Sequence, residues 1–248
     1  MWSAWRSYFE ANARRELPVI DGRGVPARWA GPLARSLAIF QVGEGGEGRV
    51  AREIERVRLA GIDDDYRAAL RLFVREEGRH AKILAAMVRA LGGQTRRAAW
   101  TERLFVRGRR LLGLRLKLLV LLAAEVVGLG FYGLLAEKLG GCPIGQALRE
   151  IAADERRHLE FHCAFFRGQT RGVAARAVFL AVWAAIAGAA CAVVLIDHRG
   201  TLRAMGVRGA AGRLAGLVRE VGRRVAGGQD GAAGSRPEDW GNERPANC

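Results

Sequence analysis

Apolar side chains recur in steps of three and four along four segments of the chain, at residues 31–61, 63–91, 111–139 and 143–170. This spacing places an apolar stripe along one side of a helix, because the α-helical repeat is 3.6 residues. The alternation of apolar and polar residues that is typical of strands is rare. The pattern therefore predicts an all-α fold with four long helices at its centre.

Glycine, proline and aspartate mark the expected ends of these helices. Gly31 and Pro32 open the first helix, and Gly61 closes it. The aspartates at 63–65 cap the second helix, where negative charge also favours the helix dipole. Pro143 begins the fourth helix, since proline fits the first turn of a helix better than its interior.

The chain is expected to have four parts. In order, they are an irregular or short-helical lead-in (1–30), the four long helices (31–170), additional helices packed on them (171–226) and a disordered tail (227–248). The additional helices are expected at 173–196 and 201–226. The tail is predicted to be disordered because it is rich in glycine and polar residues.

Charged residues occupy positions on the apolar stripes of the long helices. The stripe of the second helix reads Tyr66, Leu70, Phe73, Glu77, His80, Leu84, Met87, Leu91. The stripe of the fourth helix reads Leu148, Ile151, Glu155, His158, His162, Phe165. The third helix carries Glu125 among leucines, and the first carries Glu44 and Glu47. These charged side chains are therefore expected to face the core.

Several carboxylates in one core need a cationic partner. Removing an ionised carboxylate from water costs several kcal/mol, and a whole domain is stable by only about 5–15 kcal/mol. No lysine or arginine lies on these stripes near the acids. Carboxylate oxygens and imidazole nitrogens suit divalent first-row metals such as iron or manganese. Four carboxylates would then balance the charge of two such ions.

The candidate ligands have the composition of a di-iron carboxylate site, in which two helices give one Glu each and two give Glu-x-x-His. Over residues 32–170 the chain resembles the ferritin-like di-iron superfamily, and its motifs look most like those of the acyl-carrier-protein desaturase and related oxygenase branches. The resemblance implies a ferritin-like four-helix bundle with two iron ions, with manganese as an alternative in one or both positions. The ligands that it implies are Glu44, Glu77, His80, Glu125, Glu155 and His158.

Four more residues are candidates for supporting roles. Glu76 and Asp154 each precede a ligand Glu, and similar enzymes use such acids to accept hydrogen bonds from the ligand histidines; a solvated helix surface is the alternative. His162 could be a further ligand, a proton donor or a buried histidine satisfied by its neighbours. Tyr132 could bond a ligand carboxylate, carry an oxidising equivalent or serve as a core aromatic residue.

Glu47 shares the stripe of Glu44, and the spacing of the two halves of the chain favours Glu44 as the ligand. Glu47 is then expected either to handle protons or substrate as a catalytic carboxylate, or to pair with a nearby arginine. Residues 43–48 also match the Gly-x-Gly-x-x-Gly loop of dinucleotide-binding folds. The segment before Asp63, residues 57–62, is too short and too charged to form the second strand that this fold requires. Glycines weaken a helix by about 1 kcal/mol each, which predicts a locally weak or distorted helix there.

Residues 177–196 are 20 consecutive apolar or small residues, which is long enough to cross a bilayer. A helix surrounded by other helices is also apolar on every side. A membrane span, peripheral contact with a membrane and packing within a soluble protein all fit this segment.

Charge and cysteine content narrow the choice of partner and compartment. The net charge is +15, and arginine-rich stretches could meet an acidic carrier protein or an anionic membrane. Aromatic residues that could stack on bases are sparse, which argues against nucleic acid. The four cysteines form no C-x-x-C pair, which argues against a zinc knuckle and against a rubrerythrin with a rubredoxin-type iron centre. The amino end has no apolar leader, so the expected location is the cytoplasm, with a peripheral membrane position as an option.

Three classes of function fit these features. The resemblance favours an O2-activating oxidoreductase that hydroxylates, desaturates or N-oxygenates an organic substrate, with electrons from a separate reductase. A ferroxidase or rubrerythrin-like peroxide-scavenging protein would use the same ligands, but the extra helices and the basic surface fit it less well. A non-catalytic membrane or nucleic-acid adaptor would leave the acids without a role. The oligomeric state stays open, with a homodimer among the options.

Overall fold

The computed structural model describes residues 1–45, 52–55, 57, 59–96 and 113–227. Its helices, in chain order, are α1 (Trp2–Asn12), α2 (Ala27–Glu44), α4 (Asp64–Ala90), α6 (Leu114–Leu139), α7 (Pro143–Gln169), α8 (Val173–Asp197), α9 (Arg199–Ala204) and α10 (Ala210–Ala226). These residues contain no strand, which confirms the predicted all-α fold. The predictions for Glu47 and for nearly all of the tail lie outside the described residues.

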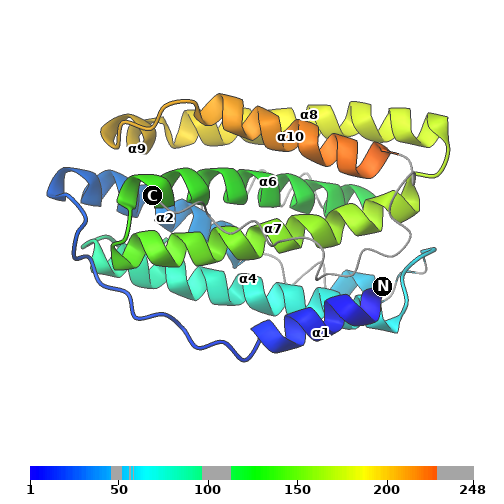
Figure 1. Cartoon of the computed structure of the whole chain (residues 1–248), viewed down its shortest axis with the longest axis horizontal. Coiled ribbons are helices and arrows are strands. Elements are labelled where there is room, and N and C mark those ends of the chain that lie inside the picture. The colour runs from blue at the N-terminus through cyan, green and yellow to red at the C-terminus, as the bar shows by residue number, and fades with distance from the viewer. Residues whose placement is uncertain (46–51, 56, 58, 97–112, 228–248) are drawn as a thin grey trace.

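The long helices run roughly alongside one another and stack in layers (Figure 1). α8 and α10 lie side by side on one side of the molecule, and both contact α6. α6 pairs with α7, α2 pairs with α4, and α4 also contacts α7. α1 packs on α4 at the opposite side from α8 and α10. The four helices that carry the predicted ligands therefore lie between two outer layers.

The capping residues predicted from the sequence are found at the ends of α4 and α7. The Asp63 carboxylate accepts a hydrogen bond of 2.8 Å from the backbone N–H of Tyr66, so α4 begins where expected. Pro143 is the first residue of α7, where its missing N–H would have no helical partner in any case. Gly92 follows the end of α4 with φ of 72°, a conformation that only glycine adopts without strain.

The ends of α2 differ from the prediction. α2 begins at Ala27 and contains Pro32, which was expected to open it. Near the start of a helix a proline removes a single helical hydrogen bond, and here the helix continues through it. α2 ends at Glu44 instead of Gly61, within the glycine-rich stretch where helix propensity is low, and residues 52–54 are helical again.

The helix predicted at 201–226 is two helices in the structure. Gly206 and Gly209 adopt positive φ values of 63° and 74° and separate α9 from α10. A backbone conformation with positive φ suits glycine, because glycine has no Cβ to clash with the backbone. Both helices still bury apolar side chains, with Leu202 in α9 and Leu214 in α10. The helix predicted at 173–196 agrees with α8.

α6 and α8 are both long and apolar enough to cross a membrane. Of the 18 most apolar consecutive residues in each helix, 89% are buried in α6 but only 33% in α8. α6 is therefore a core helix surrounded by protein, whereas α8 exposes an apolar face. The large exposed side chains on α8 are Val173, Val178, Leu180, Val182 and Ile196.

α1 forms a helix within the predicted lead-in (1–30), and its packing determines where the segment after α1 runs. Its buried side chains are Trp2, Trp5 and Phe9. Phe161 of α7 lies beneath them, with its ring centroid 5.7 Å from Trp2 and 5.4 Å from Phe9. The Trp2 indole N–H also donates a 2.9 Å hydrogen bond to the carbonyl of Gly61. These contacts hold the segment that follows α1 over α4 and α7.

Candidate metal centre

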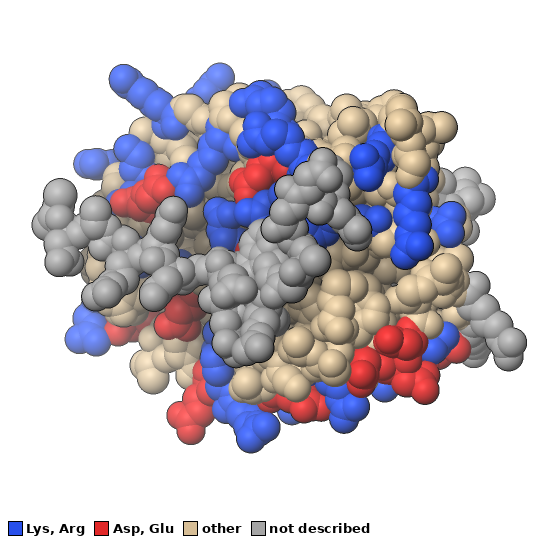
Figure 2. Space-filling view, turned by 45° about the vertical axis from the view of Figure 1, so that its right-hand side comes forward, with Lys and Arg blue, Asp and Glu red and all other residues tan. Residues whose placement is uncertain are grey.

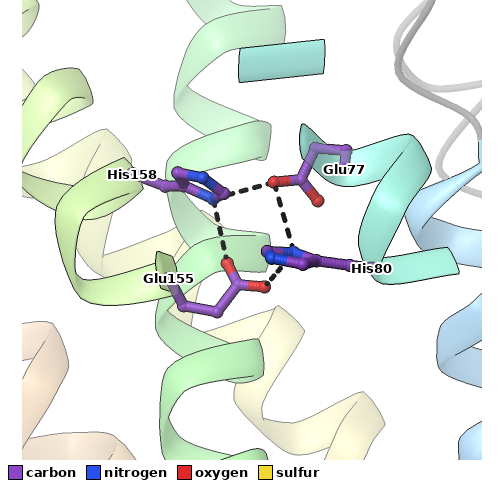
Figure 3. A group of neighbouring side chains, drawn as sticks. All are labelled: Glu77, His80, Glu155 and His158. Carbon is purple, nitrogen blue, oxygen red and sulfur yellow. Dashed lines mark ion pairs between the residues drawn. The ribbon is translucent and has the colours of Figure 1, made fainter. Parts of the chain in front are cut away.

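Two Glu-x-x-His motifs face each other in the core. Glu77 and His80 come from α4, and Glu155 and His158 come from α7. The residues of each motif are three apart on a helix and therefore share one face. One donor atom from each of the four side chains lies within 4.8 Å of the others, and all four residues are buried (Figure 3). This group could hold a metal ion.

The two motifs are interleaved, since each histidine lies close to the glutamate of the other motif. The distance from His158 Nδ1 to Glu77 Oε1 is 2.8 Å, and the distance from His80 Nδ1 to Glu155 Oε1 is 3.4 Å. Within each motif the histidine Nδ1 lies 3.9 Å from Glu77 and 3.4 Å from Glu155. Figure 3 shows the four side chains reaching into the space between the two helices.

Two further carboxylates reach this place from the other two helices. Glu125 of α6 is buried, and its Oε2 lies 3.3 Å from His158 Nδ1. Glu44, the last residue of α2, is half-buried and interacts with Glu77. The Tyr132 hydroxyl donates a 2.5 Å hydrogen bond to Glu44 Oε1. The structure thus brings all six predicted ligands together at one site.

Burial controls the protonation of Glu44 and Glu125. It raises the pKa of Glu44 well above its ordinary value, and the negative charge of Glu77 adds to this rise. The pKa of Glu125 rises in the same way, first through burial and then through the charge of Glu155. Burial and nearby negative charge thus both favour the protonated form of these two carboxyl groups. A metal ion would have to displace these protons.

The surrounding acids hold the motif histidines as cations in the metal-free protein. Burial alone would lower the pKa of His80, but its contacts with the acidic side chains of Asp154 and Glu155 outweigh this effect and raise the pKa to about 9. The pKa of His158 is also raised, because the charge of Glu77 outweighs the effect of burial. Protons on the histidines thus supply positive charge to the acids in the metal-free protein.

Glu76 and Asp154 lie behind the histidines in a crossed arrangement. His80 Nε2 lies 3.1 Å from Asp154 Oδ2, and His158 Nε2 lies 3.1 Å from Glu76 Oε2. Each acid therefore contacts the histidine of the opposite motif. Such a partner fixes the orientation of the ring and leaves Nδ1 free for the centre. Both acids are buried, as the role predicted for them requires.

Arg15 bridges these two outer acids. A single nitrogen, Nη2, lies 2.6 Å from Glu76 Oε1 and 2.7 Å from Asp154 Oδ2. Sequence reasoning does not find Arg15, which lies in the segment after α1. The only signal for it is the need of two buried acids for a cation. The contacts span 61 and 139 residues of the chain, so the sequence cannot say which arginine supplies that charge.

His162 lies one turn beyond His158 but does not belong to the cluster. Its fully buried ring packs edge-on against Phe73, with centroids 5.1 Å apart. Burial lowers its pKa to about 3, so the ring is neutral. Neither ring nitrogen has a hydrogen-bond partner among the described residues, so the partners expected of a satisfied buried histidine are not seen there.

Several donor atoms of the cluster are buried without a hydrogen-bond partner in the described part of the protein. They are Glu77 Oε1, His80 Nδ1, Glu125 Oε2, Glu155 Oε1 and His158 Nδ1. The short contact between His158 and Glu77 therefore lacks the geometry of a hydrogen bond. Buried polar atoms without partners are rare and cost about 1–3 kcal/mol each. These oxygen and imidazole donors are those that iron or manganese binds, so the residues fit a metal centre.

The cluster borders a cavity of about 150 Å³ with mostly apolar walls from α2, α6 and α8. The acids that line it are Glu44, Glu77, Glu125 and Glu155, together with Asp197. Neither His80 nor His158 lines it. The histidines and their outer acids thus close the centre on one side, and the carboxylates face the cavity on the other.

No protein-family model, no curated protein and no solved structure matches this chain. The residues of the centre and the shape of its cavity are therefore the basis for inferring a function.

Proposed function

We propose that the chain is a ferritin-like di-iron oxidoreductase that uses O2 to oxidise an organic substrate. In this proposal α2, α4, α6 and α7 form the four-helix bundle, and α8 to α10 are additions on one side. The ligands are Glu44, Glu77, His80, Glu125, Glu155 and His158. The proposal rests on one observation: four carboxylates of the cluster line a cavity whose walls are otherwise mostly apolar.

Iron is the proposed metal, with manganese as the alternative, because both accept mixed carboxylate and imidazole donors. Two divalent ions would compete with protons at Glu44, Glu125, His80 and His158, whose pKa values are all raised in the metal-free protein. When bound in reduced form, iron would supply the chemistry that activates O2. Electrons are assigned to a separate reductase.

The residues around the cavity bind substrate and exclude water. Phe40 of α2, Leu121 of α6 and Val194 of α8 line the walls. An apolar substrate group would displace water there and come to lie beside the carboxylates. Tyr132 fixes the side chain of Glu44 through its hydroxyl. A substrate that displaces water from these walls would also shield a reactive oxidant from solvent.

A ferroxidase or a rubrerythrin-like peroxide-scavenging protein would use the same ligands. The apolar cavity favours the oxidoreductase, because iron ions and peroxide are small polar species that gain nothing from apolar walls. A non-catalytic adaptor is favoured least, since it would leave the buried donor atoms of the cluster without a partner.

We further propose that α8 contacts an anionic membrane surface, which makes the protein cytoplasmic and peripheral. Residues 177–196 contain no charged side chain, and much of this stretch is exposed. Arg171 precedes α8, and Arg199 and Arg203 follow that stretch; all three are exposed and form no ion pair with the residues described. An apolar face with basic ends complements a bilayer with anionic headgroups. A symmetric dimer through α8 would instead bring basic ends together.

Figure 2 shows the corresponding charge distribution on one face of the molecule. The view is turned about the vertical axis of Figure 1, so α8 and α10 remain in the upper part. Lys and Arg side chains prevail in that part around uncharged surface, and most of the Asp and Glu side chains in view lie lower. An acidic carrier protein is the alternative partner for the same basic surface.

Stepwise addition of ferrous iron tests the proposed function. Metal-free protein is loaded anaerobically at increasing ratios, exposed to O2, and assayed for the ferrous iron that remains. The proposal expects fast oxidation to stop at about two iron ions per chain. A ferroxidase or storage protein would continue to oxidise further iron in each new addition. Glu125→Ala should abolish the fast phase, and Glu137→Ala, an exposed acid on the same helix, should retain it.

A further inference from the structure

Two polar residues outside the metal cluster line the same cavity. They are Asp197, the last residue of α8, and His198, which follows it. The imidazole of His198 is buried, at 3% exposed. Asp197 Oδ2 is a buried oxygen without a hydrogen-bond partner among the described residues. Such atoms at the edge of a mostly apolar cavity are suited to recognise a polar group on a ligand.

The hydrogen bonds behind His198 determine which of its ring nitrogens carries the proton. The Thr201 hydroxyl donates its only proton to the carbonyl oxygen of Pro32, at 2.7 Å. The Thr201 oxygen therefore accepts the proton of the Ser36 hydroxyl, also at 2.7 Å. The Ser36 oxygen in turn accepts from His198 Nδ1, at 2.8 Å. Burial lowers the pKa of His198 to about 4, so the ring is neutral and Nε2 carries no proton.

This part of the cavity therefore presents acceptors only. The acceptors are the unprotonated Nε2 of His198 and the carboxylate of Asp197. A carboxylate and a bare imidazole nitrogen offer no proton of their own, so a ligand group placed here must donate hydrogen bonds. An ammonium group donates to both acceptors and forms a charge-assisted hydrogen bond with the carboxylate.

The spacing of residues along α2 sets the distance between these acceptors and the metal cluster. Ser36, Phe40 and Glu44 follow one another in steps of four and so lie on one stripe of α2. Ser36 bonds His198, and Phe40 stacks on the same ring with centroids 4.8 Å apart. Glu44 lies one turn further, which is a rise of about 6 Å. A ligand that spans from His198 to the carboxylates needs a body of about this length.

The volume and the apolar walls of the cavity indicate the size and the chemical character of this middle part of the ligand. At about 150 Å³, the cavity is of the size that accepts benzene when its walls are apolar. Ala190, Val193 and Val194 line it from the same face of α8 as Asp197. The part of a ligand between the acceptors and the cluster would therefore be a hydrocarbon group of about six carbon atoms.

We propose that the cavity selects a small primary amine, whose ammonium group binds Asp197 and His198 and whose apolar end lies at the carboxylates. This inference rests on the proposed function, because it names the substrate class of that site. The orientation places a carbon atom, and not the nitrogen, at the oxidising centre, so it favours hydroxylation or desaturation over N-oxygenation. In a hydroxylation, one atom of O2 enters a C–H bond to give C–OH. Two electrons and two protons, supplied through the reductase, convert the other atom to water.

Calorimetric titration of the metal-free full chain with matched probes tests the binding site. The probes are benzylamine, benzyl alcohol, toluene and benzoate, which share one body and differ in the polar group. We expect benzylamine to bind most tightly and benzoate not to bind. Asp197→Asn should weaken benzylamine about ten- to a hundredfold, because a charge-assisted hydrogen bond is lost. The same variant should leave toluene unchanged. Asp64→Asn makes the same chemical change on the surface and should alter neither.

Two outcomes would overturn the inference: equal affinity for benzylamine and toluene, or benzylamine binding that Asp197→Asn does not weaken. The second outcome would mean that the amine binds at the acid cluster instead. Asp197→Asn is expected to fold, since Oδ2 has no hydrogen-bond partner to lose in the described structure. The proposed function is tested separately. Iron-loaded protein that binds benzylamine but forms no oxidised product with O2 and a reductant would contradict the function and leave the amine site intact.

Discussion

Replacing Arg15 by leucine removes the cation that joins the two acids behind the histidines. Glu76 and Asp154 are buried, and each contacts Arg15 Nη2 at 2.6–2.7 Å. Without Arg15 these acids would keep their contacts to the histidines but would lose their shared counter-charge. We expect the change to affect both the stability of the metal-free protein and its affinity for metal.

The size of the effect follows from the contacts that are lost. Hydrogen bonds to charged groups contribute about 1.5–3 kcal/mol each, and Arg15 makes two of them. The Arg15 side chain is 35% exposed, so water replaces part of the interaction. We therefore expect Arg15→Leu to lower the free energy of unfolding by about 2–4 kcal/mol. Glu76 and Asp154 would be held less firmly without Arg15, so they would orient the two histidines less precisely, and metal binding should weaken about 10–100-fold.

Urea unfolding of the metal-free protein, followed by circular dichroism, measures the stability change. With a slope of about 1–3 kcal/mol per molar urea, the midpoint should fall by roughly 1–2 M. Arg23→Leu is a matched control, because that arginine is 88% exposed and should matter little. Arg15→Lys should recover most of the loss, since one nitrogen makes both contacts and an ammonium group can replace it. Equal midpoints for Arg15→Leu and the control would refute the bridging role.

Three further changes test other parts of the structure. Tyr132→Phe should destabilise the metal-free protein by about 1–2 kcal/mol in urea unfolding, because Glu44 loses its donor; a change below about 0.5 kcal/mol would mean that Tyr132 is only a core aromatic residue. The pKa of His198 is about 4 when folded and about 6.5 when unfolded, so its contribution to stability is present above pH 6.5 and is lost as the pH falls to 4. The loss is about 3 kcal/mol, and His198→Gln should remove this part of the pH dependence; an unchanged slope between pH 6.5 and 4 would contradict it. Val178→Asp with Val182→Asp should abolish flotation with vesicles that contain phosphatidylserine, and retained flotation would exclude α8 as the membrane contact.

The helices and the ligand positions could be predicted because their signals are local. Glu77 and His80 are placed on the core face of α4 by apolar residues spaced in steps of three and four, and this spacing can be read without the rest of the chain. Asp63 and Pro143 likewise cap or open their helices through contacts within a single turn. The ligand roles themselves stay predictions, although the structure gathers those residues at one site.

The remainder depends on contacts between distant segments. Whether Asp154 contacts His80 or its own motif's His158 is decided by how α4 and α7 face each other, which no spacing within either helix encodes. The same is true of Arg15 and of His198, whose partner Ser36 lies 162 residues away. The predicted start of α2 was also wrong, because a proline can stand either at the first turn of a helix or slightly further inside it. Pro32 was expected to open α2 but lies inside it, because the helix already begins at Ala27 and a proline near the start of a helix removes only one helical hydrogen bond.

The content of iron and manganese per chain tests the central claim most directly. It would be measured by elemental analysis on protein purified from metal-supplemented cells, for wild type, Glu125→Ala and Glu137→Ala. The account predicts about two metal ions per chain in wild type and Glu137→Ala, and a loss of metal in a still helical Glu125→Ala. Near-zero metal in wild type, even after anaerobic loading with ferrous iron, would contradict it.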